Sequence, residues 1–400
     1  MKRLNRIAFS VVCCVFASQA VWAQATIDTV KVHQLNEVVV KGVRAAKEAP
    51  YAVANIKKSE LQQFSRTGKE LPFLLSRTPG ILAWGENGLG TGTSYMRIRG
   101  AAGSRINVTL DGVALNSPED QTVFWANMNS YAALLGSVQI QRGVGSSTNG
   151  DGAFGGSISM ATAFPSLIPT AEVTGSFGSF NTYNTGVSFS TGLLGKHLIF
   201  DGAYHETATD GYIDGTSGRS GSYYGGLTWL ADNFKVSYKN IGNFEKTGQA
   251  WSGVLASDYD TNFTLMSDGI YTYKDMDAAG LGKFNILTAG LVRNGKGDYT
   301  IVPYTMRDGS LWNKTTDNFY QNHNILSAVW TPNDHWSHNF AVHYTYGYGY
   351  YNEFKSQSKF AKFGLTFYDA DGNFVKRSDF VRKKGLTQHT YGIVYNTNYK

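Results

Sequence analysis

The sequence predicts a small α+β domain followed by a transmembrane antiparallel β-barrel, and three observations lead to this fold class. An export signal occupies residues 1–23, helical and strand patterns mix at 59–164, and alternating apolar and polar residues fill 165–400. Export combined with alternating strands of about ten residues is typical of outer-membrane barrels. Length alone favours two domains or more, because single cores stop growing near ~250–300 residues.

Composition narrows the class of protein. Charged residues make up 16% of the chain and aromatic residues 14%, whereas a typical soluble domain has about 25% charged residues. A chain this aromatic is not intrinsically disordered. The 36 basic and 30 acidic residues give a net charge of +6, which is too small an excess to suggest a nucleic-acid-binding protein. Both cysteines, Cys13 and Cys14, lie in the export signal, which excludes disulfide frameworks, cysteine-ligated zinc and thiol catalysis from the rest of the chain.

The first 23 residues are predicted to be a secretory signal. Basic residues precede an apolar run at 7–17, and Val21-Trp22-Ala23 places small residues at −3 and −1 of a cleavage site after Ala23. The apolar run is too short to cross a bilayer as a helix. A buried helix at a cytosolic N-terminus is the alternative, which these flanks disfavour. No cysteine lies at the cleavage point, which argues against a lipid anchor.

Helices and strands are both expected in residues 59–164. Ser59 with Gln62, and Thr67 with Glu70, have the capping-box spacing that begins a helix. Pro72 weakens the second helix, because counted from Thr67 it lies beyond the positions that tolerate proline. Four short strands are predicted next, at residues 95–99, 105–110, 138–142 and 157–161.

A period of two replaces the helical period after Pro165. In residues 339–350 the even positions are apolar or aromatic, and the odd positions are small or polar. The same division recurs at 183–190, 234–239 and 391–398. Such strands fit either a soluble β-sandwich or an outer-membrane barrel. The export signal, the strand length and the Tyr and Phe at strand ends favour the barrel.

No motif supports an enzyme or a metal site. Residues 150–155 have the spelling of a dinucleotide fingerprint, but they precede a strand instead of a helix, so their glycines are expected to permit a tight turn. His335, His338 and His343 are expected to be solvated and not to bind metal. No pair of carboxylates stands out as a general acid and base. We predict no catalytic residue, no metal site and no cofactor.

Several short motifs occur in a fixed order between residues 71 and 163. They are Arg77-Thr78-Pro79-Gly80-Ile81, Arg97-Ile98-Arg99-Gly100, Leu110-Asp111-Gly112-Val113 and Val138-Gln139-Ile140-Gln141-Arg142-Gly143, the last leading through Gly152-Ala153-Phe154-Gly155-Gly156 to Ser157-Ile158-Ser159. Each is weak alone, but together they make Leu71–Ala163 resemble the plug domain of TonB-dependent outer-membrane receptors. The barrel portion is also similar, notably at 317–319 and 343–351. The resemblance implies that the plug fold depends on Arg97, Arg99, Gly100, Asp111, Gly112, Arg142, Gly143, Gly155 and Gly156.

The resemblance implies an α+β plug domain (59–164) followed by a transmembrane antiparallel β-barrel (165–400) in the outer membrane of a Gram-negative-type bacterium. It further implies a receptor that binds a scarce extracellular nutrient and imports it with energy delivered by the TonB complex. In the periplasmic segment 24–58, the residues that look like the TonB-contacting segment are Leu35, Asn36, Glu37, Val38, Val39 and Val40. A Val-rich segment can add to a partner sheet as a strand. It could equally be the first plug strand, and Asp28–Val32 is the alternative contact.

Cargo is expected at the plug loops that face outward in this family. These loops correspond to residues 84–94 and 116–130, and the candidates in them are Trp84, Asn87, Gln121 and Trp125. The alternative for the tryptophans is packing against the barrel wall. Family cargoes include ferric siderophores, haem, cobalamin and glycans, and the short segment after Ala23 favours an iron chelate. The expected partners are therefore the TonB complex, outer-membrane lipid and a small-molecule cargo, with no nucleic acid.

Three positions depart from the family pattern. Gln139 stands where the family usually has Glu, Val144 where Pro is common, and Asn149 where Tyr is common. The first departure puts in doubt a plug-to-barrel ion pair at that position.

The number of strands predicts that the barrel is incomplete in this chain. Residues 165–400 hold about eight to ten strands of membrane-spanning length, whereas plugged lumens belong to barrels of about 22 strands. We therefore expect the 400-residue chain to be a fragment that does not insert as a stable barrel. The alternative class of protein is a secreted or surface β-rich adhesin or binding protein without transport activity.

Overall fold

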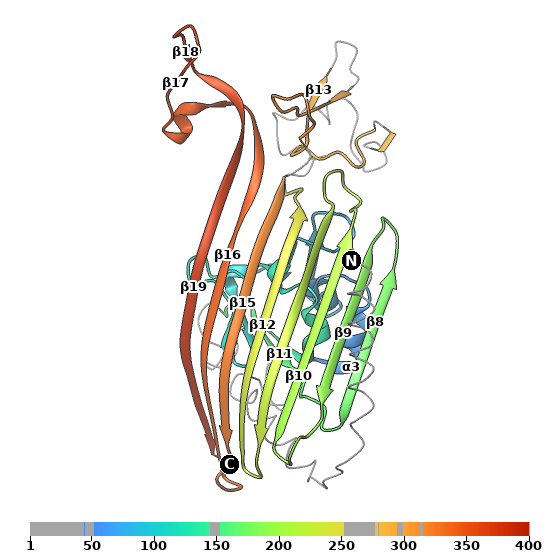
Figure 1. The fold of residues 1–400 in the computed structure, drawn as a ribbon, viewed down its shortest axis with the longest axis vertical. Helices are drawn as coiled ribbons and strands as arrows, with labels where there is room; N and C mark the ends of the chain where they lie inside the picture. The colour runs from blue at the N-terminus through green and yellow to red at the C-terminus, as the bar shows by residue number, and fades with distance from the viewer. Residues whose placement is uncertain are drawn as a thin grey trace, which may run out of the picture.

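The computed structural model describes residues 44, 52–144, 153–251, 277–278, 280–293, 299–312 and 315–399. The export signal and the segment Leu35–Val40 lie outside the described residues. The described chain forms a small mixed sheet with helices, then a large antiparallel sheet, and the small unit lies against one face of the large sheet (Figure 1).

The small unit is built on a five-stranded sheet with the order β1-β6-β7-β4-β5. Its strands are β1 (Ala52–Lys57), β4 (Ile106–Leu110), β5 (Val113–Ala114), β6 (Leu135–Arg142) and β7 (Gly156–Thr162). β4 and β7 run parallel, and the other pairs are antiparallel. A separate hairpin joins β2 (Ile81–Gly85) to β3 (Ser94–Ile98). The four strands predicted from alternation are present as β3, β4, β6 and β7.

The plug sheet begins before the expected boundary at residue 59. β1 precedes that boundary, yet all six of its residues pair with β6. This strand was not predicted, because the segment 52–57 is short and only partly apolar. As an edge strand, β1 is hydrogen-bonded on one side only.

The helices begin at other residues than the capping boxes suggested. α3 (Lys58–Ser65) has Lys57 as its N-cap, and the Lys57 amide donates to Glu60 Oε1 at 3.3 Å. The prediction that Ser59 begins this helix was therefore wrong. α4 (Leu71–Leu75) has Glu70 as its N-cap, which places Pro72 in the first turn, where proline is tolerated.

Thr67 does not cap α4. Its hydroxyl donates to the Phe64 carbonyl at 2.7 Å and so closes the end of α3. Three short elements complete the unit: η1 (Gly103–Arg105), η2 (Trp125–Met128) and α5 (Tyr131–Leu134).

One apolar core joins the plug sheet to its helices. Leu61 of α3, Leu74 of α4, Ile140 of β6 and Ile158 of β7 are all fully buried in it. Ile241 of the large sheet also belongs to this core. The plug is therefore packed against the large sheet by apolar burial as well as by polar contacts.

The large sheet has eight antiparallel strands in an up-and-down order. They are β8 (Pro169–Phe177), β9 (Tyr183–Thr191), β10 (Leu198–Thr209), β11 (Gly218–Leu230), β12 (Phe234–Gly248), β15 (Thr316–Trp330), β16 (Trp336–Lys359) and β19 (Arg377–Tyr399). The sheet is not closed, because β8 and β19 end the order and do not pair with each other among the described residues. Nine residues or more per strand suffice to cross an outer membrane.

The two faces of the large sheet differ as the alternation predicted. On β16, Phe340 and Tyr344 are exposed on the outer face, whereas Asn339 and Ala341 are each only 1% exposed on the face toward the plug. Apolar side chains outside and small or polar side chains inside are the pattern of a strand between lipid and a filled lumen.

The connections at the two ends of the large sheet differ in length. Residues 192–197, 231–233 and 331–335 separate consecutive strands of the large sheet at one end, whereas residues 178–182, 210–217, 249–315 and 360–376 separate them at the other. In outer-membrane barrels the short turns face the periplasm and the long loops face outward. We therefore refer to the end with the long connections as the outer end.

The long connections carry short strands of their own. These are β13 (Ala289–Arg293), β14 (Tyr299–Pro303), β17 (Phe367–Tyr368) and β18 (Phe374–Val375), with η5 (Phe360–Phe363). β16 and β19 rise beyond the other strands and carry β17 and β18 at their tip (Figure 1). In the described part of the chain, no helix has the length and apolar character needed to cross a membrane.

Candidate functional site

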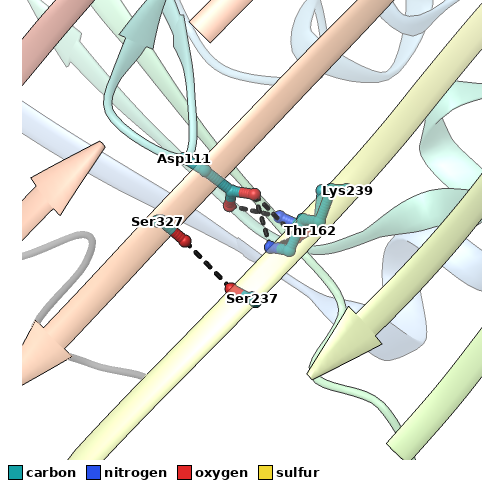
Figure 2. Close-up of polar contacts among 5 residues, drawn as sticks. All are labelled: Asp111, Thr162, Ser237, Lys239 and Ser327. Atoms are coloured by element: carbon teal, nitrogen blue, oxygen red, sulfur yellow. Dashed lines mark hydrogen bonds and ion pairs between the residues drawn. The ribbon is translucent and has the colours of Figure 1, made fainter. Parts of the chain in front are cut away.

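A buried ion pair joins the plug to the barrel wall (Figure 2). Asp111 lies in the two-residue turn between β4 and β5, and Lys239 comes from β12. The Lys239 ammonium donates to Asp111 Oδ2 at 2.6 Å, and both side chains are almost completely buried. We refer to Asp111, Thr162 and Lys239 as the latch.

Thr162, the last residue of β7, completes the latch. Its backbone amide donates to Asp111 Oδ1 at 3.0 Å and its hydroxyl donates to Oδ2 at 2.8 Å. Lys239 also contacts the Thr162 hydroxyl. One carboxylate therefore holds together a plug turn, the end of a central plug strand and a barrel strand.

The local sequence explains why Asp111 points at the wall. Asp111 and Gly112 have φ values of +50° and +83°, as a tight hairpin turn of the Asp-Gly type requires. Burial by itself raises the pKa of Asp111, but the attraction of Lys239 and the hydrogen bonds from Lys239 and Thr162 outweigh it and hold the pKa below its ordinary value. The carboxylate is therefore ionised at neutral pH.

Polar contacts also join the plug to the barrel at the outer end. The Ala250 amide donates to Glu86 Oε2 at 2.8 Å, and the Tyr95 hydroxyl donates to Glu86 Oε1 at 2.5 Å. The Tyr212 amide, in the connection after β10, donates to the Asn87 carbonyl at 3.0 Å. The plug loop after β2 is therefore fastened to the outer rim.

A cavity of about 740 Å³ lies between the barrel wall and the part of the plug formed by the β2–β3 hairpin and residues 120–126. Six aromatic residues line it: Trp84, Tyr95, Phe124, Trp125, Trp251 and Tyr351. Its charged lining residues are Arg97, Asp120, Glu245, Asp317, Glu353, Lys355 and Arg382. Pockets of this size with aromatic walls and a few charged groups hold small molecules.

Two of the four predicted cargo residues lie in this cavity. Trp84 stacks on Tyr95 with ring centroids 5.5 Å apart and stays 41% exposed, so its ring is available to a bound molecule. Trp125 also lines the cavity, but it is 5% exposed and packs in the plug core. The packing alternative therefore describes Trp125 better than Trp84.

The other two candidates do not line the cavity. Asn87 is buried, and its side-chain oxygen accepts the amides of Leu89 and Gly90 within its own loop. Gln121 lies in a turn with φ +59°, where its backbone carbonyl accepts from Asn116. Both residues shape loops, and the structure gives them no position facing the cavity.

Arg97, Arg99 and Gly100 build the hairpin end after β3. Arg99 and Gly100 have φ values of +48° and +83°, and Ile98 and Ala101 exchange backbone hydrogen bonds around them. Arg97 donates to the Gly100 carbonyl at 3.2 Å. These motif residues therefore hold a tight turn, as their place in the plug motif implies.

Arg142, Gly143, Gly155 and Gly156 lie where β6 ends and β7 begins. Arg142 donates to the Pro79 carbonyl at 2.7 Å, and the Gly143 amide donates to the Gly155 carbonyl at 2.9 Å. A Cβ on Gly155 would overlap a neighbouring side chain, and one on Gly156 would overlap the backbone of β6. The close packing at both positions therefore requires glycine.

Sequence reasoning missed Lys239, and it missed Arg44, whose guanidinium donates to the hydroxyls of Ser137 and Ser159 in the plug sheet. The alternation placed Lys235 and Lys239 on the polar face of β12, but that face meets the plug and not water. A lysine among small inward residues needs a nearby carboxylate. The presence of such a lysine in the β12 sequence could therefore have predicted a contact with an acidic residue of the plug. Gln139, which put a family ion pair in doubt, donates to Asn55 of β1 inside the plug.

The site combines a binding cavity with a fastened plug. Among the described residues, no group of three or more His, Cys, Asp or Glu side chains could hold a metal ion. The arrangement can bind a small molecule at the outer end and keep the space below it filled.

The comparisons with known proteins agree with this geometry. Residues 45–157 match the family model described as the TonB-dependent receptor plug domain. No curated protein sequence matches the chain. TonB-dependent receptors are outer-membrane proteins of Gram-negative bacteria, so the plug match confirms the predicted location.

Solved receptors share the fold at low sequence identity. The ferric-catecholate import receptor Fiu of E. coli K12 is similar with a TM-score of 0.58 and 13% identity, over 89% of this chain and 45% of Fiu. The siderophore receptor PirA of Acinetobacter baumannii has a TM-score of 0.53 and 15% identity, over 86% and 45% of the two chains.

FpvA of P. aeruginosa, solved with bound pyoverdine, has a TM-score of 0.53 and 12% identity, over 87% of this chain and 43% of FpvA. The chain thus spans less than half the length of the solved receptors that it matches. Residues 45–157 are a TonB-dependent receptor plug domain, and the sheet that follows has the fold of part of such a receptor's barrel.

Proposed function

We propose that this chain belongs to an outer-membrane receptor that binds a ferric siderophore and imports it past its plug with energy delivered by TonB. The observation that carries the proposal is the plug itself, a folded domain that the Asp111–Lys239 ion pair fastens to the inner face of a sheet of membrane-length strands. A receptor fastened in this way is closed at rest.

Opening such a receptor needs work from outside the protein. The outer membrane has neither a nucleotide supply nor an ion gradient across it, so the energy has to come from the inner membrane. We assign the contact with TonB to Leu35–Val40, with Asp28–Val32 as the alternative. A Val-rich segment suits this role because its backbone can pair with a partner sheet.

The cavity supports a small chelate as the cargo. Its volume of about 740 Å³ is within the usual range for small-molecule sites. Trp84 and Tyr95 present stacked rings to it, and its charged groups can hydrogen-bond to a polar ligand. Fiu, PirA and FpvA carry siderophore-related names, and this supports iron chelates ahead of haem, cobalamin or glycans.

Growth and uptake of a deletion strain test the proposal. The strain is grown on defined ferric chelates, haem, cobalamin or glycans as the scarce source, and uptake of radioactive iron is measured with the receptor restored. We expect growth and uptake to depend on the receptor only for one class of ferric chelate. Dependence on haem, cobalamin or a glycan alone would overturn the choice of cargo.

A pair of variants tests the cavity. Trp84→Ala removes an exposed ring that lines the cavity and should weaken binding of the chelate by about tenfold. Leu82→Ala is the matched control, because Leu82 is exposed on the same strand but does not line the cavity. Equal affinities of the two variants would show that cargo binds elsewhere.

The adhesin alternative is tested by a carbonate wash of isolated envelopes. An integral receptor stays in the membrane fraction after the wash. Release of the protein into the soluble fraction would favour the adhesin.

A further inference from the structure

Arg44, which precedes β1 in the chain, is hydrogen-bonded to the middle of the plug sheet. Its Nη1 donates to Ser137 Oγ at 3.0 Å, and its Nη2 donates to the Ser137 carbonyl at 3.2 Å. Its Nε donates to Ser159 Oγ at 3.3 Å, and its Nη2 also reaches the Ser159 carbonyl at 3.0 Å. One guanidinium therefore bridges β6 and β7 through four hydrogen bonds.

β7, to which Arg44 is hydrogen-bonded, is also the strand that contacts the barrel wall. Ser159 lies in β7, and three residues later Thr162 of the same strand enters the latch with Asp111 and Lys239. β7 is therefore held at one point by a cation from the N-terminal segment and at another by a cation from the wall. A continuous chain of contacts runs from Arg44 through β7 to β12.

This route differs from the one along the backbone. β1 is an edge strand that pairs only with β6, with Ala52 opposite Arg142 and Lys57 opposite Ser137. A pull applied at Ala52 would separate such a ladder one pair at a time. Arg44 precedes Ala52 in the chain, so a pull from the N-terminal side reaches Arg44 first.

We propose that Arg44 and Lys239 make β7 a load-bearing strap, so that a pull on the N-terminal segment is resisted at the barrel wall before β1 is peeled away. The proposal deepens the proposed function and rests on it, since it assumes that the N-terminal segment is pulled. Arg44 and Lys239 are positioning residues, which act through the plug and not on cargo.

The charge of Arg44 suits this role. Burial lowers its pKa to about 10, with the attraction of Asp111 opposing the change. Arg44 therefore stays charged at neutral pH, and hydrogen bonds from a charged donor are stronger than those from a neutral one.

Single-molecule pulling tests the strap. The full receptor in native outer-membrane vesicles is pulled through a tag inserted ahead of Arg44, and rupture events are recorded for three variants. We expect Arg44→Gln to lose the first rupture event, which is the release of Arg44 from β6 and β7. We expect Lys239→Met to lower the force at which β7 separates from the barrel wall. Arg142→Gln is the control, because Arg142 also binds a plug carbonyl but lies outside this path. It should keep both events.

A chemical readout covers the case of a variant that fails to fold. The milder double variant Ser137→Ala/Ser159→Ala removes two of the four acceptors of Arg44 and leaves the backbone carbonyls. Reaction of Arg44 with phenylglyoxal, followed by mass spectrometry, should rise about tenfold in this variant. An unchanged first rupture in Arg44→Gln, or free reactivity of Arg44 in the unchanged protein, would overturn the proposal.

Failure of the strap and failure of the proposed function give different results. If the rupture events change as expected while no ferric chelate is taken up, the strap stands and the proposed function fails. If chelate uptake is found but the rupture events are the same in all variants, the proposed function stands and the strap is wrong.

Discussion

At the scale of single residues, the plug depends on charges that are buried but paired. Asp111 satisfies its carboxylate with Lys239 and with both polar groups of Thr162. Removing one partner of a buried ion pair costs more than removing both, because it leaves an uncompensated charge. This asymmetry makes the latch testable.

We expect Lys239→Met to destabilise the plug by about 3–5 kcal/mol, since it leaves Asp111 buried and unpaired. The double variant Asp111→Asn/Lys239→Met should lose less, because no charge remains. Urea unfolding of the plug is followed in vesicles by labelling a buried cysteine introduced as Ala132→Cys. Lys246→Met, at an exposed position of the same strand, is the control. If Lys239→Met were as stable as the double variant, the proposed stabilising role of the latch would be wrong.

Glu70 should make plug stability depend on pH. Burial raises its pKa well above the ordinary value, although hydrogen bonds from Asn129 and the Gly92 amide oppose the change. The folded plug therefore binds this proton more firmly than the unfolded plug, so stability is highest below the ordinary Glu pKa and falls as pH rises above it.

Glu70→Gln removes this dependence and still offers Asn129 an acceptor. We expect the free energy of unfolding of the variant to equal that of the wild-type plug near pH 4 and to exceed it at pH 8 by about 1–3 kcal/mol. The same thiol-labelling assay, repeated across this pH range, measures the difference. A constant difference at all pH values would show that Glu70 does not titrate in this way.

The residue-scale features divide into those the sequence could predict and those it could not. The Asp111-Gly112 turn is local, since its dipeptide carries its own conformational preference. Lys239 and Arg44 are not local. Their partners lie 128 and 93 residues away in the chain. Alternation of period two predicts which residues of a barrel strand face inward, but it does not predict which plug turn an inward residue contacts.

At the scale of elements, the period and length of a sequence run predicted most helices and strands correctly. The residues at which the helices begin were not predicted correctly. β3, β4, β6 and β7 follow from alternation, but α3 begins at Lys58 because the side chain three residues after Lys57 caps it. β1 was missed because its assignment depends on pairing with β6, which is decided by the tertiary structure. Of the four cargo candidates, Trp84 alone both is exposed and lines the cavity, and each of these is again a tertiary property.

The segment Leu35–Val40 lies outside the described residues, so its role remains a prediction. We expect Val38→Pro to abolish uptake and leave binding of cargo intact, because proline removes a backbone donor from any added strand. Uptake and binding of the labelled chelate are measured separately. Thr29→Pro is the matched variant in the alternative segment. Normal uptake by Val38→Pro combined with loss in Thr29→Pro would move the contact to Asp28–Val32.

At the scale of the whole molecule, the plug is fastened unequally around its edge. At the outer end, Glu86, Asn87 and Thr93 all hydrogen-bond to the barrel. Beside α3, a cavity of about 330 Å³ lies between the plug and β8, β9 and β10, and Arg66 at the end of α3 contacts Ser176 and Glu172 of β8. The change of sequence pattern near Pro165 predicted that a plug precedes a barrel. The uneven distribution of plug-to-barrel contacts depends on side-chain packing, which the sequence of a single strand does not show.

Two engineered disulfides use this inequality to ask which part of the plug moves. A Cβ on Gly68, just after α3, would lie 3.7 Å from the Asn184 Cβ, and one on Gly92 would lie 3.5 Å from the Thr247 Cβ. Both separations suit a disulfide. Both glycines have positive φ, so the two tethers carry similar backbone strain and serve as controls for each other.

We expect the oxidised Gly68→Cys/Asn184→Cys receptor to bind its chelate but not to import it, and reductant should restore uptake. This tether fixes the part of the plug that follows β1 and α3, which a pull from the N-terminus would move first. The Gly92→Cys/Thr247→Cys tether should leave uptake intact, because it fixes a loop that hydrogen bonds already hold. Uptake by the oxidised Gly68 receptor would show that the α3 side stays in place, and loss in both receptors would mean that the plug moves beyond residue 92.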